Sequence, residues 1–95
     1  MKYPFHLIIT NNIQYAANEV AISRAVKTWH NQLQGELLLG TKFRVFSIYD
    51  QIRGYRPTSF ETMITPHILN DREFHLLKEI EQILARDEAE FISLI

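Results

Sequence analysis

The sequence predicts an α+β fold of two layers, in which a small, mainly antiparallel three-stranded sheet packs against two longer helices and one short helix. The chain has 95 residues, 46% of them hydrophobic and 22% charged, which is typical of a single globular domain over residues 1–95. Its strand-type segments are short and rich in β-branched and aromatic residues, whereas its last third has a helical period. The predicted order of elements is therefore β-α-β-β-α-α.

The first strand is expected over residues 3–10, where the apolar run ends at an Asn-Asn turn signal. A helix is expected next, running to about Gln34. Its N-cap is one of three asparagines: Asn11, Asn12 or Asn18. Apolar residues fall on two opposite faces of this helix, so either it begins only near Asn18 or it is buried on both sides.

Trp29 lies in the second half of this expected helix and allows two interpretations. A lone tryptophan on an apolar stripe usually anchors a core. If that side of the helix is uncovered, Trp29 instead forms a contact patch with Ile22, Val26 and Leu33 for a second subunit or a partner protein.

Residues 37–49 predict a β-hairpin, with Gly40-Thr41 as its two-residue loop. The second arm, residues 42–49, alternates regularly. Alternation places Phe43 and Val45 on one face and Arg44, Phe46 and Ile48 on the other. Because both faces carry apolar residues, this strand is expected to be central in the sheet.

The residues from Thr58 to Glu61 read Thr-Ser-Phe-Glu, which matches a capping box and predicts a short helix ending near Ile64. Proline follows at position 66, and the residue before a proline is disfavoured in a helix.

A second capping box, from Asn70 to Glu73, predicts the start of the final helix. Its apolar stripe consists of Phe74, Leu77, Ile80, Leu84 and Phe91. The seven-residue spacing of Leu77, Leu84 and Phe91 resembles a coiled-coil dimer seam, but packing of this helix on the sheet is the favoured interpretation.

The sequence predicts no catalytic, cofactor-binding or metal site. The chain has no cysteine, which excludes disulfides and thiolate metal ligands. No serine stands in a G-x-S-x-G motif, no two of the four histidines have an i, i+4 spacing, and no glycine-rich loop precedes a helix.

The segment of residues 42–56 is the one stretch whose composition indicates binding. Its predicted contact residues are Lys42, Arg44, Arg53, Tyr55 and Arg56. Cations interleaved with aromatic side chains suit single-stranded nucleic acid, and tyrosine and arginine are also enriched at protein interfaces. The alternative is that the aromatic residues are core and the loop is merely solvated.

Charge is unevenly distributed along the chain. Residues 1–60 carry seven basic and three acidic side chains, whereas residues 61–95 carry three basic and eight acidic ones. Such polarity fits an anionic partner on one side or complementary pairing between subunits. The net charge of −1 lacks the basic excess typical of a general nucleic-acid binder.

These observations lead to three hypotheses of function. The first is a small, non-enzymatic protein-binding or regulatory module, with homodimerisation left open, that occupies a surface of a larger protein, for example as an inhibitor or adaptor from a mobile element. The alternative is a nucleic-acid-binding regulator that uses the segment 42–56. The third is a small enzyme whose site forms only on folding or across a dimer interface, as a cleft that holds a histidine beside an acid or a hydroxyl. A cytoplasmic location without membrane association or cofactor is expected.

Overall fold

The computed structural model describes residues 3–23, 26–31, 33–50, 56–66 and 69–92. Six strands and two helices lie within these residues. In chain order they are β1 (Tyr3–Thr10), α1 (Ile13–Ser23), β2 (Val26–Asn31), β3 (Gln34–Leu37), β4 (Lys42–Ser47), β5 (Pro57–Thr62), α2 (Asp71–Arg86) and β6 (Glu90–Phe91).

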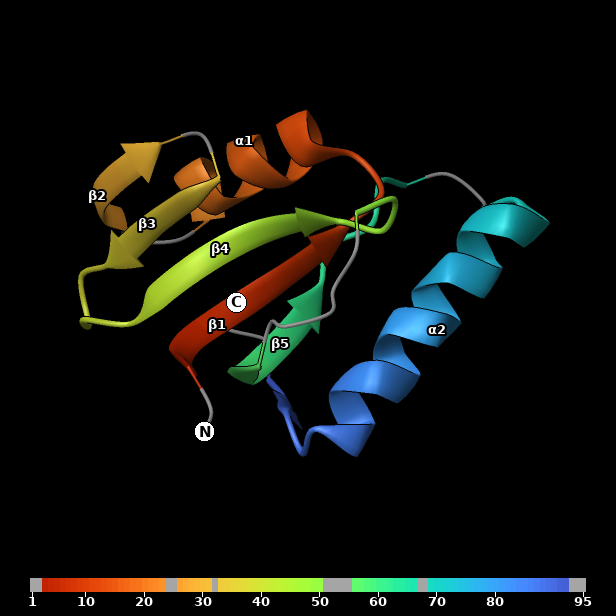
Figure 1. Cartoon of the computed structure of the whole chain (residues 1–95). Helices are drawn as coiled ribbons and strands as arrows, with labels where there is room; N and C mark the ends of the chain where they lie inside the picture. The colour runs from red at the N-terminus through yellow and green to blue at the C-terminus, as the bar shows by residue number, and fades with distance from the viewer. Residues whose placement is uncertain (1–2, 24–25, 32, 51–55, 67–68, 93–95) are drawn as a thin grey trace.

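All six strands belong to one mixed sheet of order β2-β3-β4-β1-β5-β6 (Figure 1). β1 runs parallel to both of its neighbours, β4 and β5, and β6 runs parallel to β5. β2, β3 and β4 are successively antiparallel. The predicted α+β class is confirmed, but the prediction of three mainly antiparallel strands is wrong because β1 pairs in parallel on both sides.

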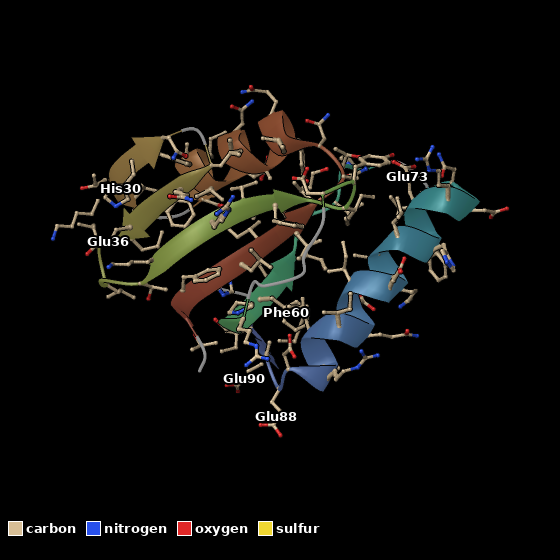
Figure 2. The ribbon with its side chains drawn as sticks, in the orientation of Figure 1. His30, Glu36, Phe60, Glu73, Glu88 and Glu90 are labelled. Carbon is tan, nitrogen blue, oxygen red and sulfur yellow. The ribbon has the colours of Figure 1, made fainter. Side chains whose placement is uncertain are left out.

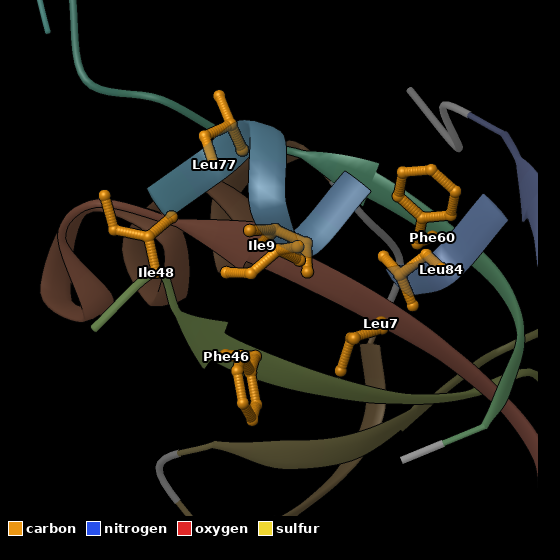
Figure 3. Close-up of a cluster of buried hydrophobic side chains, with 8 residues drawn as sticks. Leu7, Ile9, Phe46, Ile48, Phe60, Leu77 and Leu84 are labelled. Atoms are coloured by element: carbon orange, nitrogen blue, oxygen red, sulfur yellow. The ribbon is translucent and has the colours of Figure 1, made fainter. Parts of the chain in front are cut away.

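Helices cover both faces of this sheet, so the fold has three layers instead of the predicted two. Leu7 and Ile9 of β1 pack with Leu77 and Leu84 of α2 (Figure 3). Ile8, between them in sequence, belongs to a second cluster with two residues of α1, Ala16 and Val20. Because neighbouring side chains of a strand point to opposite faces, α1 and α2 lie on opposite sides of β1.

The first helix is shorter than predicted, since α1 ends at Ser23 instead of near Gln34. Its N-cap is Asn12, whose side-chain oxygen accepts a hydrogen bond from the Tyr15 amide at 3.0 Å. Residues 26–31 and 34–37 form strands β2 and β3. The sequence placed two opposed apolar faces on one long helix. In the structure these residues are divided between α1 and the strand β2, and β2 contains β-branched and aromatic residues that suit a sheet.

The hairpin is confirmed, but its first arm is displaced and the predicted two-residue loop is wrong. β3 pairs antiparallel with β4 through Gly35↔Phe43, so the first arm is residues 34–37 and a four-residue loop follows. Gly40 in this loop has φ of +90°, a conformation that glycine adopts without steric cost. β4 lies between β3 and β1, which confirms the predicted central strand.

The predicted short helix over residues 58–64 is wrong, because residues 57–62 form strand β5. Polar and apolar residues alternate only from Ser59 to Glu61, and Phe60 is buried on the α2 face while Glu61 is buried on the other. The Thr-x-x-Glu pattern therefore imitates a capping box within a strand that pairs with β1 and β6.

The final helix begins as predicted. The Asn70 side chain accepts a hydrogen bond from the Glu73 amide at 2.8 Å, and Glu73 Oε1 accepts one from the Asn70 amide at 3.1 Å. The helix ends at Arg86, and Phe91 lies in β6. A coiled-coil seam through Leu77, Leu84 and Phe91 is therefore wrong, because Phe91 is not helical. Leu77 and Leu84 pack on the sheet, which is the interpretation that the sequence favoured. Neither α1 nor α2 is long and apolar enough to span a membrane.

Candidate functional site

Strand β2 forms one outer edge of the sheet. In the described part of the chain its only strand neighbour is β3. Five of its six residues are exposed, so nothing described covers this edge. An edge strand presents a row of backbone N–H and C=O groups that a further strand can pair with.

A groove of about 360 Å³ runs between α1 and this edge. Its lining residues are Ile13, Gln14 and Ala17 of α1 and Trp29 and Asn31 of β2. The inner face of α1 holds the helix in place, because Ala16 and Val20 are fully buried against the sheet. The small side chain of Ala17, which lies next to this buried face, leaves the groove open.

Trp29 is the aromatic wall of the groove. Its ring packs edge-on against Phe43, with 5.3 Å between the ring centroids and an interplanar angle of 88°. Trp29 pairs with Gly35, where a Cβ atom would lie 2.7 Å from Phe43 Cζ, so the glycine makes room for this packing. Trp29 nevertheless remains 38% exposed, and Ile22 at the end of α1 is 80% exposed. Of the residues in the predicted contact patch, Ile22 lies on α1, whereas Val26 and Trp29 lie on β2.

The predicted contact residues of the segment 42–56 are only partly described. Lys42 and Arg56 are exposed at the starts of β4 and β5, and Arg44 is half-buried within β4. Arg53 and Tyr55 lie outside the described residues. Phe43 and Phe46 are 2% and 3% exposed, so the aromatic residues of β4 are core and offer no stacking surface.

The carboxyl ends of the parallel strands, where open sheets commonly bind ligands, are joined by side chains. Asn11 Nδ2 donates to Thr65 Oγ1 at 2.9 Å, and the Thr65 amide donates to Asn11 Oδ1 at 3.0 Å. These bonds join the loops that follow β1 and β5. Nearby, the Tyr49 hydroxyl donates to Glu73 Oε2 at 3.0 Å, and this bond raises the pKa of Tyr49 above its ordinary value.

A buried polar network joins β1 to β5 on the α1 side of the sheet. His6 Nδ1 lies 2.7 Å from Ser59 Oγ, and His6 Nε2 lies 2.9 Å from Glu61 Oε1. The side chains of His6 and Glu61 are 1% and 2% exposed. The third hypothesis required a histidine beside an acid or a hydroxyl, and His6 contacts both. It also required a cleft, and the groove beside β2 does not include these residues.

Sequence reasoning missed this network because His6 is 53 positions from Ser59 and 55 positions from Glu61. The available signal was the alternation of polar and apolar residues through Ser59, Phe60 and Glu61, which is typical of a strand. Of the other histidines, His30 and His75 are exposed on β2 and α2, and His67 lies outside the described residues (Figure 2 labels His30).

Within the described ranges, no group of three or more histidine, aspartate or glutamate side chains is placed to hold a metal ion. No protein-family model matches the chain, and neither a curated protein nor a solved structure matches it. We therefore infer function from the chemistry of the residues themselves.

Proposed function

We propose that this protein is a protein-binding module that takes up an extended segment of another protein along the outer edge of β2. The observation that carries the proposal is the coincidence of an exposed edge strand with a groove at the same edge. A strand added to β2 satisfies the backbone groups of both chains, and one of its side chains enters the groove beside Trp29.

The dimensions of the groove favour a peptide side chain as its occupant. Its volume of about 360 Å³ stands near the lower end of the range of ligand pockets, which is about 300–1,000 Å³. Every second side chain of an extended segment points to the same face, so one or two of them enter the groove. Ile13, Ala17 and Trp29 make an apolar side chain the expected occupant.

The edge also carries features that limit unselective pairing. The register of β2 with β3 shifts at two places, between Val26 and Thr28 and between Trp29 and Asn31. The exposed Lys27 lies on this edge strand, with its Nζ 4.0 Å from Glu36 Oε1 of the neighbouring strand β3. Lysines and strand irregularities discourage edge-to-edge aggregation. A partner segment must therefore match an irregular strand, which favours a selective interaction.

The nucleic-acid alternative has less support from the described residues. Binding to single strands needs exposed aromatic faces beside the cations, and Phe43 and Phe46 are buried. Lys42 and Arg44 share one face of β4, but their partners in the register are Glu36 and Gln34, so this face is not uniformly basic.

Trp29 provides the test, because it is the only tryptophan of the chain. Peptides selected from a displayed random library should share an alternating apolar pattern and change the Trp29 fluorescence on binding. Ala17→Arg fills the groove and should weaken binding at least about tenfold, as expected at an interface hot spot. Gln82→Arg, on the exposed side of α2, is the matched control and should bind normally.

Backbone methylation of the selected peptide distinguishes strand addition from binding of side chains alone. Methylating one alternate set of amides should abolish binding, and methylating the other set should not, because only one set faces β2. Equal binding to the Ala17→Arg variant, or equal tolerance of both methylated sets, contradicts the proposal. A dimer that Ala17→Arg dissociates would show instead that a second copy of the chain occupies the edge.

A further inference from the structure

The parallel pairing of β1 with β5 brings a hydroxyl and a carboxylate within hydrogen-bond distance of the two nitrogens of one imidazole. His6 is the register partner of Ser59, and Ile8 is the register partner of Glu61. The His6 ring lies between the two polar side chains, 2.7 Å from Ser59 Oγ and 2.9 Å from Glu61 Oε1. Both are hydrogen-bond distances, so the three groups form a continuous relay.

The Glu61 carboxylate at one end of this relay determines which atoms donate the hydrogen bonds. A carboxylate oxygen only accepts, so the proton between His6 and Glu61 is carried by His6 Nε2. In the neutral imidazole Nδ1 then has a lone pair, and the Ser59 hydroxyl donates to it. This is the arrangement of a hydroxyl nucleophile with an oriented general base.

The three residues of the relay differ in exposure, and a nucleophile must be accessible to its substrate. The side chains of His6 and Glu61 are 1% and 2% exposed, whereas Ser59 is half-buried. Ser59 is therefore the least buried residue of the three. The imidazole of His6 and the carboxylate of Glu61 are both buried away from water.

We propose that Ser59 is an activated nucleophile that accepts an acyl group from activated esters. Ser59 Oγ forms a bond to the acyl carbon while its proton passes to His6 Nδ1. The bond from the acyl carbon to the leaving oxygen breaks, and His6 returns the proton to that oxygen, giving an acyl-serine and an alcohol or phenol. Glu61 is a positioning residue, because it orients the ring and stabilises the transient imidazolium.

The neighbour of Ser59 on its other side indicates the class of donor. The register of β5 with β6 pairs Ser59 with Glu90, whose side chain is exposed on the same face (Glu90 is labelled in Figure 2). A carboxylate at this position repels anionic phosphoryl or sulfonyl donors. Neutral acyl esters are therefore the expected substrates.

The first test treats the folded protein with p-nitrophenyl acetate and measures acetylation of each serine by peptide mapping. Ser59 should be acetylated about a hundredfold faster than Ser23 or Ser47, which have no histidine neighbour in the described structure. Glu61→Gln keeps an oxygen acceptor but removes the charge, so it should abolish most of the difference in acetylation rate between Ser59 and the other serines. Thermal unfolding of the variant verifies that it is folded.

The second test uses the absence of cysteine from the chain. Ser59→Cys introduces a single thiol beside His6, and its alkylation by iodoacetamide can be measured against pH. The midpoint should lie at least about one pH unit below that of the exposed control Thr58→Cys, because an adjacent imidazolium stabilises a thiolate. Adding Glu61→Gln should move the midpoint back up.

A network with a purely structural role predicts different results. Ser59 would then react no faster than the other serines, and the pH midpoint of the Ser59→Cys variant would match that of Thr58→Cys. Either result in a folded protein overturns the proposal.

Discussion

The half of the sheet built around β1 and the hairpin edge formed by β2 and β3 differ in almost every physical respect. β1 has a parallel strand on each side and a helix on each face. β2 has a described strand on one side only, and five of its six residues are exposed. Figure 2 shows His30 and Glu36 at the hairpin end, opposite the end formed by α2. The first region concentrates buried contacts, and the second concentrates accessible groups.

This difference separates stability from binding. Burial of apolar side chains supplies most of the folding free energy, so substitutions around β1 should cost the most. An edge that binds a partner must leave backbone and side-chain groups accessible, and such regions contribute less to stability.

Substitution in the α2 core should have the largest effect. Leu84 is 0% exposed and packs on the sheet, so Leu84→Ala should lower the free energy of unfolding by about 3–4 kcal/mol through lost burial and an internal cavity. Leu39→Ala, in the hairpin loop at 94% exposure, should change it by less than about 0.5 kcal/mol. Urea denaturation of both variants measures the contrast, and equal losses would contradict it.

The buried network should rank second. Glu61→Leu removes the acceptor of His6 Nε2 and leaves a buried donor without its partner, which should cost about 2 kcal/mol. The double variant His6→Leu/Glu61→Leu removes both groups and should be less destabilised than the sum of its two single variants. Additive losses in urea denaturation would indicate that the two side chains act independently.

The two described glycines of the hairpin should respond for different reasons. A Cβ at Gly35 would lie 2.6 Å from the Thr28 carbonyl oxygen and 2.7 Å from Phe43 Cζ, so Gly35→Ala should cost about 1.5 kcal/mol through overpacking. Gly40 has open space around it but a φ of +90°, so Gly40→Ala should cost about 1 kcal/mol through backbone strain.

Trp29 fluorescence distinguishes these two causes. Gly35→Ala displaces the packing of Trp29 on Phe43 and should shift the emission of the folded protein. Gly40→Ala, in the loop, should leave the emission unchanged. A spectral shift in both variants would mean that the hairpin moves as one unit.

The smallest effect should appear at the link between β4 and α2 in alkaline solution. The hydrogen bond to Glu73 raises the pKa of Tyr49 above its ordinary value of 10.0, so the folded state retains this proton to a higher pH than the unfolded state does. The associated stability is complete below pH 10 and is lost as the pH rises through the folded pKa. Stability curves from pH 9 to 12 should therefore decline less for Tyr49→Phe than for the unsubstituted protein.

Several local features could be predicted from the sequence because their causes lie within a few residues. The capping box of Asn70 and Glu73 starts α2 as predicted, and the alternation of β4 assigns its faces correctly. The hairpin was found although its first arm was displaced. In each case the residues that determine the structure are close neighbours in the chain.

The candidate site could not be predicted to the same extent. The sequence left Trp29 open between a core anchor and a contact residue, and the groove beside it needs α1 and β2 side by side. Residues 26–31 were assigned to a helix because the pairing of Trp29 with Gly35, and of Gly35 with Phe43, is not visible in a local pattern. Arg53 and Tyr55 of the predicted contact segment lie outside the described residues.

The composition and local patterns of the chain thus determined its α+β class, the central position of β4 and the start of α2. The tertiary structure decided the strand order, the second covered face of the sheet and the relay of Ser59, His6 and Glu61, in which His6 is more than fifty positions from the other two. The physical reason is that capping and alternation depend on neighbouring residues, whereas sheet order depends on which distant segments bury each other's surfaces.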